Sequence, residues 1–253
     1  MARPKRIGAL VPSTNQVVEP DFNMMAPKGV TVLAERMWLG GPSEPGGGDG
    51  SELADMNADI PRASRYVASA GVDAIAYACT SGTYRTGTID YSREIGQAIT
   101  RETGLPSIIA LEASIEALRS VGARRLSLAG PYGDVLLKER LKPLLESEGF
   151  EVVSAEGEPE MKQRTQAVVI GNQDPEVILS FVASNVAEEA DTVFLPGTAW
   201  RAVEVVEELE ERLGKTVITV NQATFWKSLR TLGVTEPIQG FGKLLASPQS
   251  VAS

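Results

Sequence analysis

The sequence predicts an α/β protein made of two pseudo-symmetric, Rossmann-like halves, each a parallel sheet flanked by helices, with the active site in the cleft between them. The first observation is that short, wholly apolar segments alternate along the chain with longer segments of mixed polarity, as strands and helices do in such folds. The second is a repeat. Arg6 and Arg125 open apolar runs that end at Pro12 and Pro131, at an offset of 119 residues.

The repeat continues further along the chain. Asp73 corresponds to Asp191, and Thr80 to Thr198, at an offset of 118 residues. Two halves of about 115 residues account for these matches. We therefore expect a first half over residues 1–112, with residues 222–253 packing back onto it, and a second half over residues 113–221.

Each element of the first half has a local justification. Residues 6–11 are predicted to form a buried strand, because an apolar run follows Arg6, and the turn 12–15 caps a helix that runs to about residue 25. The glycine-rich and proline-rich stretch 40–50 cannot hold regular structure, and is either a mobile lid over a site or a surface loop. The remaining first-half elements are a strand within 29–39, a helix over 51–70, a strand over 73–78, a helix over 91–103, a strand over 107–111 and a helix over 113–121.

The second half repeats this order. Its expected strands cover residues 125–130, 150–155, 191–195 and 216–220, and its helices run to residue 148 and over 175–189, 202–213 and 222–232. The charged stretch 157–167 is expected to be a loop, and residues 240–253 a tail.

Composition excludes several classes of function. A net charge of −9 without a basic stripe argues against nucleic acid, and a single cysteine excludes an internal disulfide. No apolar run approaches the ~18 residues of a membrane span, and the N-terminal apolar stretch is too short for a signal peptide, so we expect a cytoplasmic protein. Histidine is absent, which excludes Ser-His-Asp and Cys-His catalysis and His-ligated zinc.

Cys79 lies where the apolar run 73–78 meets a cluster of small hydroxyl residues. Ligands of open α/β sheets bind at the carboxyl ends of the strands. A thiol at a helix start with hydroxyl neighbours is in a setting that lowers its pKa. A lone cysteine is also commonly a small buried hydrophobe. In the second half, the segment Gly197-Thr198 occupies the corresponding position. Together with the turns at Pro12 and Pro131, these loops form two similar anion-binding nests, suited to a small carboxylate-bearing ligand.

These residues resemble the aspartate/glutamate racemase superfamily, in its maleate cis-trans isomerase and arylmalonate decarboxylase branch. The resemblance extends from Ile7 to about Gly233 and rests on five marks: Val11-Pro12-Ser13-Thr14-Asn15, Cys79-Thr80-Ser81, Gly122-Ala123-Arg124-Arg125, Pro131-Tyr132 and Phe225-Trp226. It implies that Cys79 and Tyr132 are catalytic. It also implies that Asn15, Tyr132 and Asn172 hold the substrate carboxylates. The anion-binding loops add further candidates for substrate binding, namely Ser13, Thr80, Ser81, Gly197 and Thr198. No metal or organic cofactor is implied, and a homo-oligomer is an expectation of the resemblance alone.

The sequence departs from that family at Gly197, where racemases and isomerases carry a second cysteine. Two-base racemisation needs a proton donor on each face of a planar carbanion, so it is disfavoured. Addition of Cys79 to a cis-enedioate needs one thiol, which makes a maleate-type isomerase the first hypothesis. An arylmalonate-type decarboxylase, or another lyase, using Cys79 as proton donor or base is the second. A non-catalytic carboxylate-binding protein is the third. Phe225 and Trp226 are expected in the core.

Overall fold

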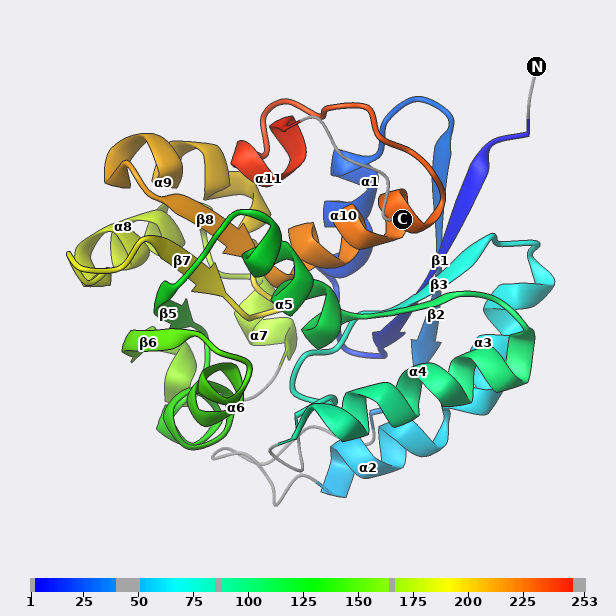
Figure 1. Cartoon of the computed structure of the whole chain (residues 1–253). Helices are drawn as coiled ribbons and strands as arrows, with labels where there is room; N and C mark the ends of the chain where they lie inside the picture. The colour runs from blue at the N-terminus through cyan, green and yellow to red at the C-terminus, as the bar shows by residue number, and fades with distance from the viewer. Residues whose placement is uncertain (1–2, 40–50, 85–87, 164–166, 248–253) are drawn as a thin grey trace.

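Two four-stranded parallel sheets form the centre of the molecule (Figure 1). The computed structural model describes residues 3–39, 51–84, 88–163 and 167–247, so residues 40–50, expected to form a lid or a surface loop, lie outside the described residues. The first sheet has the order β2-β1-β3-β4 and the second the order β6-β5-β7-β8. Their strands are β1 (Lys5–Pro12), β2 (Val30–Met37), β3 (Ala74–Tyr77), β4 (Ser107–Ile109), β5 (Arg125–Gly130), β6 (Glu151–Gly157), β7 (Thr192–Leu195) and β8 (Thr216–Thr219).

When the strands of each half are numbered from the first strand of that half, both sheets have the same order, 2-1-3-4. This identity confirms the predicted fold class of two similar α/β halves. The helices are α1 (Val18–Met25), α2 (Ser51–Ala58), α3 (Ile60–Ser69), α4 (Ile89–Thr103), α5 (Ala110–Ser120), η1 (Val135–Leu141), α6 (Lys142–Ser147), η2 (Met161–Gln163), α7 (Ala167–Gly171), α8 (Pro175–Asn185), η3 (Val203–Val205), α9 (Val206–Leu213), α10 (Val220–Thr231) and α11 (Gly242–Ala246).

Two helices that the sequence predicts as regular are irregular next to a proline: one is divided and the other is partly π-helical. The predicted helix over 51–70 breaks at Asp59 into α2 and α3, and Pro61 lies in the first turn of α3. The predicted helix ending at residue 148 is a π-helical segment, η1, followed by α6 with Pro143 in its first turn. Proline has no N–H to donate to the preceding turn, so a regular helix cannot continue through it.

Other boundaries differ because apolar periodicity does not mark where a buried strand becomes a buried helix. α5 begins at Ala110, directly after β4, and α10 begins at Val220, directly after β8. Thr219 closes a capping box with Gln222, which explains the start of α10. Three short helices were not predicted: η2 within the expected loop 157–167, α7, and α11 within the expected tail.

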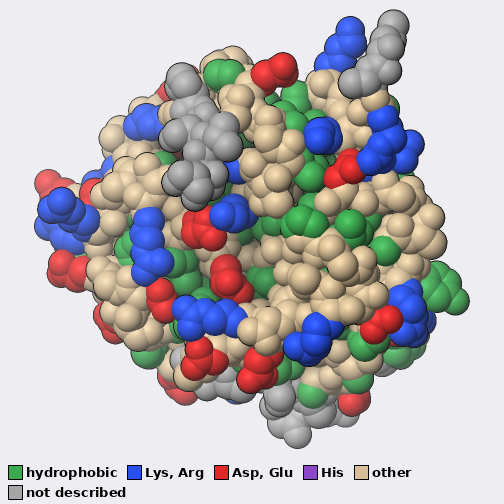
Figure 2. Space-filling view, turned by 45° about the vertical axis from the view of Figure 1, so that its right-hand side comes forward, with side chains coloured by type: hydrophobic (Ala, Val, Ile, Leu, Met, Phe, Trp, Pro, Cys, Tyr) green, Lys and Arg blue, Asp and Glu red, His purple; other side chains and the backbone are tan. Residues whose placement is uncertain are grey.

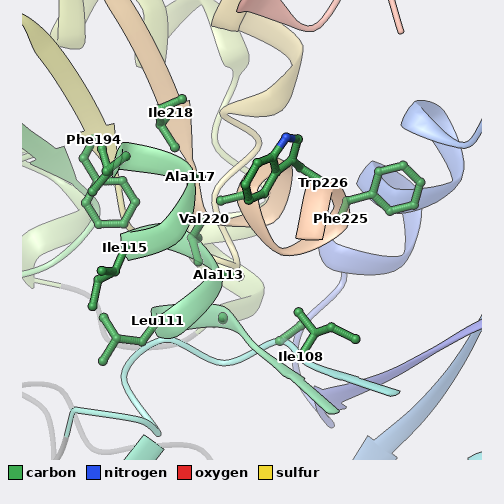
Figure 3. Packing of buried hydrophobic residues seen from close by; sticks show 14 of the residues in the cluster. Ile108, Leu111, Ala113, Ile115, Ala117, Phe194, Ile218, Val220, Phe225 and Trp226 are labelled. Atoms are coloured by element: carbon green, nitrogen blue, oxygen red, sulfur yellow. The ribbon is translucent and has the colours of Figure 1, made fainter. Parts of the chain in front are cut away.

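The largest hydrophobic cluster joins the two halves. Figure 3 shows α5 and α10 packed together, with Phe194 of β7 and Ile218 of β8 on one side and Ile108 of β4 on the other. Phe225 and Trp226 belong to this cluster, as predicted, and the Phe225 ring lies 5.2 Å from that of Phe22 on α1. Because core residues are close-packed, this cluster fixes the orientation of the two sheets relative to each other.

The C-terminal segment contacts both halves. α10 packs on α1 and β3 of the first half and on β8 of the second, whereas α11 packs on α9 and β8. The predicted boundaries of the two halves, after residues 112 and 221, therefore stay a prediction. So does the packing of residues 222–253 onto the first half. Within the described residues, no helix combines the length and apolar character needed to cross a bilayer. The face in Figure 2 carries acidic and basic side chains interspersed.

Candidate active site

Cys79 follows β3 by two residues and is 3% exposed. Every residue of β3 is buried, so the thiol that follows the strand also lies in the protein interior. The segment after the thiol is a turn, closed by the Thr83 N–H and hydroxyl, which both donate to the Thr80 carbonyl at 2.9 and 2.6 Å. The next helix, α4, starts only at Ile89. The expectation of a thiol at a helix start is therefore wrong.

The structure also contradicts the expected lowering of the thiol pKa. Burial raises the pKa of Cys79 above its usual value, and this effect outweighs three interactions that lower it. These come from the Gly82 N–H, the Ser81 hydroxyl, whose oxygen lies 3.8 Å from the sulfur, and the Tyr77 hydroxyl. At neutral pH the thiol is therefore protonated, with three groups arranged to stabilise a thiolate when one forms.

The sulfur sits against a small polar network that requires glycine at position 82. The Tyr77 hydroxyl donates to Asn57 Oδ1 at 2.5 Å, and Asn57 Nδ2 donates to the Gly82 carbonyl at 3.1 Å. A Cβ on Gly82 would lie 2.3 Å from the Tyr77 hydroxyl oxygen and 3.3 Å from the Cys79 sulfur. No side chain fits in that space, so the glycine allows the loop backbone to approach the thiol.

This network gives a first prediction. The Tyr77 O–H donates to Asn57 Oδ1 while the thiol is protonated, and it stabilises a thiolate by turning toward the sulfur. Because one pKa unit corresponds to about 1.4 kcal/mol and a hydrogen bond to a charged group contributes about that much, Tyr77→Phe should slow alkylation of Cys79 by iodoacetamide about tenfold at pH 7. The rate in both proteins should rise about tenfold per pH unit from pH 6 to pH 8, since only the thiolate reacts. Tyr66→Phe, at an exposed tyrosine, is the control. Equal rates for Tyr77→Phe and wild type would show that the phenol does not stabilise the thiolate.

Three residues of the other loops contact one another, and one of them, Tyr132, lies near Cys79. Asn15 is 3% exposed, and its Oδ1 accepts from the N–H groups of Val17 and Val18 at 2.9 and 3.0 Å, which caps α1. Its Nδ2 lies 3.5 Å from the hydroxyl oxygen of Thr198 in the second half. Asn15 is thus both a helix cap and a contact across the cleft.

Tyr132 completes this group from the turn after β5. Burial raises the pKa of Tyr132 most, and its proximity to Cys79 raises it further, whereas the Thr198 N–H that donates to the phenol oxygen lowers it. The phenol therefore stays protonated at neutral pH and is available as a hydrogen-bond donor to a bound anion. The structure brings Cys79, Asn15, Tyr132 and Thr198 together from both halves.

The structure does not bring all of the other predicted binding residues into this group. The Ser13 hydroxyl accepts from the Leu39 N–H at 3.1 Å, and the Thr80 hydroxyl is buried without a partner among the described residues. Ser81 is beside the thiol. Asn172, which follows α7, is exposed, and its Oδ1 accepts from Gln16 Nε2 at 2.7 Å. Its contact is thus with the residue after Asn15, and the structure does not bring Asn172 into the group around Cys79.

Gly197 has no room for a side chain. A Cβ at this position would lie 2.8 Å from both Cγ and Cδ of Pro131 and 3.1 Å from Cβ of Trp200. Trp200 is itself held by its indole N–H, which donates to Gln173 Oε1 at 2.6 Å. The place that a second thiol would take is therefore filled by the Pro131 ring and the Trp200 side chain.

Sequence reasoning missed two polar groups near the site. The hydroxyls of Thr14 and Tyr84 are buried and have no hydrogen-bond partner among the described residues. Burial, then Tyr132 and Cys79, raise the pKa of Tyr84, so its phenol lies near both. Buried hydroxyls are normally hydrogen-bonded, so these groups are candidates to contact a ligand. Nothing in the local sequence distinguishes Tyr84 from a core tyrosine.

A surface hollow of about 480 Å³ lies elsewhere, between α4, β4, α5 and α10. Four of its charged residues have partners: Arg93 pairs with Asp90, Lys227 with Glu116, and Glu112 accepts from the Ser92 hydroxyl. Neither Cys79 nor Tyr132 lines it. The hollow is separate from the candidate active site.

Comparison with known proteins places this geometry in a family. The family model of arylmalonate decarboxylase matches residues 7–245. The chain is 27% identical over 254 residues to a maleate isomerase of Pseudomonas putida, covering 95% of this chain and 97% of that protein. It is 26% identical over 244 residues to the arylmalonate decarboxylase of Bordetella bronchiseptica, covering 94% and 95%.

The solved structures agree on the fold. The maleate cis-trans isomerase of Nocardia farcinica, in a variant with a covalently bound succinylcysteine intermediate, matches with a TM-score of 0.84 at 24% identity, covering 96% of this chain and 98% of that one. The relatives and the family model thus cover nearly the whole chain. The chain therefore belongs to the arylmalonate decarboxylase family, and it is an enzyme of the kind to which both the maleate isomerases and arylmalonate decarboxylase belong.

Proposed function

We propose that this enzyme isomerises a small unsaturated dicarboxylate of the maleate type, with Cys79 as the nucleophile and without a cofactor. The observation that carries the proposal is the meeting of Cys79 with Asn15, Tyr132 and Thr198 from the other loops. The similarity to maleate isomerases, one of which holds a succinyl group on cysteine, supports it. An amide, a phenol and several hydroxyls supply hydrogen bonds for two carboxylates.

The reaction can be balanced with one thiol. The Cys79 thiol loses its proton to solvent, the sulfur bonds to one alkene carbon, and the π electrons move onto the carboxyl group of the other alkene carbon as an enediolate. Rotation about the former double bond follows. The C–S bond then breaks, the double bond reforms as trans, and the proton returns to the sulfur. Donors on the enediolate oxygens, for which Asn15 and Tyr132 are placed, stabilise the charge that develops.

The experiment that tests the proposal is proton NMR of the purified protein with maleate. Fumarate should appear with wild type, and its rate should rise with pH below the thiol pKa, because the thiolate adds to the alkene. A protein with a cleft that only binds carboxylates would instead show a raised unfolding midpoint with maleate and no turnover. Maleate left unchanged by wild type at every pH from 6 to 9 would contradict the isomerase for this substrate.

One observation favours a second candidate, an arylmalonate-type decarboxylase. Burial keeps the Cys79 thiol protonated at neutral pH, which is the state required of a proton donor. In that reaction the bound malonate loses CO2, the electron pair is held as an enediolate, the thiol proton moves to carbon, and solvent reprotonates the sulfur. CO2 release from an aryl- or alkylmalonate, together with unchanged maleate, would favour this activity over isomerisation.

A further inference from the structure

A buried carboxyl, that of Asp21, is linked through Asn221 to the loop that carries Thr198 in the active site. Asp21, on α1, is 1% exposed, and its Oδ2 accepts from Asn221 Nδ2 at 2.7 Å. Asn221, also 1% exposed, is the second residue of α10. The same Nδ2 donates to the Thr198 carbonyl at 3.0 Å. One amide therefore joins α1 of the first half to the loop that carries Thr198 in the second.

The acceptor atom of this amide has no partner as long as Asp21 is ionised. Asn221 Oδ1 is buried and has no hydrogen-bond donor among the described residues. A neutral carboxylic acid has an O–H that can donate, and the Asp21 carboxyl is already in contact with this amide. Burial, the largest effect, raises the pKa of Asp21 to about 8, while the hydrogen bond from Asn221 opposes it. The raised pKa of Asp21 and the unsatisfied amide oxygen of Asn221 thus both favour a protonated Asp21.

The charges around Asp21 do not favour its ionisation strongly. Glu204 raises the pKa of Asp21 and Arg201 lowers it, and these two residues pair with each other at 2.8 Å. The charged groups on the elements packed against it are otherwise engaged: Glu19 of α1 pairs with Arg36 of β2, Glu35 of β2 with Arg62, Lys227 of α10 with Glu116, and Arg230 stacks on Trp226.

We propose that Asp21 is a positioning residue which, as a neutral carboxylic acid, holds Asn221 and through it the Thr198 carbonyl. Thr198 is then fixed at three atoms. Its carbonyl binds Asn221, its N–H donates to Tyr132, and its hydroxyl lies 3.5 Å from Asn15 Nδ2. The inference rests on the proposed function in one respect, namely that the loop carrying Thr198 is part of the active site.

A stability measurement tests the protonation without any substrate. A carboxyl whose pKa is higher in the folded than in the unfolded state contributes stability that is fully present below about pH 4 and is lost as the pH rises to about 8. Asp21→Asn removes this titration but keeps an acceptor for Asn221 and a donor for its oxygen. From pH 4 to pH 8, the unfolding midpoint of wild type should therefore fall by more than about 5 °C relative to that of Asp21→Asn.

Asp90→Asn is the matched control, because the Asp90 side chain is 73% exposed and pairs with Arg93 on the surface. Its midpoint should follow that of wild type within about 1 °C over the same range. Parallel curves for wild type and Asp21→Asn would mean that Asp21 is ionised in the folded protein and would overturn the proposal.

Activity with maleate tests the positioning role. Asp21→Leu, which has similar size and no polar atom, should lower kcat/KM about tenfold or more, and Asp21→Asn should stay within about twofold of wild type at pH 7. Above pH 8, kcat of wild type should decline relative to that of Asp21→Asn. An Asp21→Leu variant as active as wild type would show that the hydrogen bonds from Asp21 through Asn221 do not position Thr198. If wild type does not turn over maleate, the proposed function fails, and the stability curves still decide the protonation of Asp21.

Discussion

Replacing Cys79 by alanine is expected to lower the rate of maleate isomerisation at least ~10³-fold. In the proposed reaction the sulfur forms and breaks a bond to the substrate, and loss of a nucleophile typically removes this much of kcat or more. The sequence offers no second thiol and no histidine that could take over. The measurement is the initial rate of fumarate formation by proton NMR at pH 8, at several maleate concentrations.

The fold of this variant must be checked alongside its activity. Cys79 is a small buried group, so its replacement should lower the unfolding midpoint by only about 2–4 °C. Cys79→Ser keeps the size and polarity of the side chain but is a much weaker nucleophile, and it should be almost as inactive as the alanine variant. Substantial isomerase activity in either variant would mean that the reaction does not pass through a sulfur adduct.

The arrangement of the strands could be predicted from the sequence because the repeat constrains it. Matches such as Pro12 with Pro131 and Asp73 with Asp191 lie at strand ends, where the chain must turn at the same place in both halves. Buried parallel strands are also nearly wholly apolar, which makes them visible in composition. The break at Asp59 and the π-helical segment before Pro143 were missed because periodicity alone does not show how a helix adapts to a proline.

Only part of the site could be predicted in this way. Position in the repeat was enough to place Cys79 and Thr198 at strand ends, and the capping pattern was enough to place Asn15. The thiol pKa was predicted wrongly, because local sequence shows the hydroxyl neighbours but not the burial of the sulfur, and burial is the larger effect. The contacts of Asp21 with Asn221 and of Gly197 with Pro131 join residues far apart in sequence, and no local pattern reports them.

Gly197→Cys is expected to destabilise the protein and not to add a second working thiol. Its Cβ would lie 2.8 Å from two carbons of the Pro131 ring, which is rigid and cannot turn away as a flexible chain would. Forcing atoms into a packed region costs about 1–3 kcal/mol of the free energy of unfolding. Urea unfolding measures this cost. Gly130→Ala is the matched control, because its Cβ would meet Pro196 at 3.4 Å, an ordinary contact.

A double variant tests whether the clash with the Pro131 ring is what makes Gly197→Cys destabilising. Pro131→Ala removes the ring, so Gly197→Cys should be less destabilising in that background than in wild type, with a coupling energy of about 0.5–3 kcal/mol. A Gly197→Cys variant that is as stable as wild type and isomerises maleate faster would show that Pro131 and Trp200 move aside readily. If the clash holds, a single thiol reaches bound substrate from one face. Any reaction in which that thiol protonates carbon should then give one enantiomer, and racemisation should appear only where the double variant admits a second thiol.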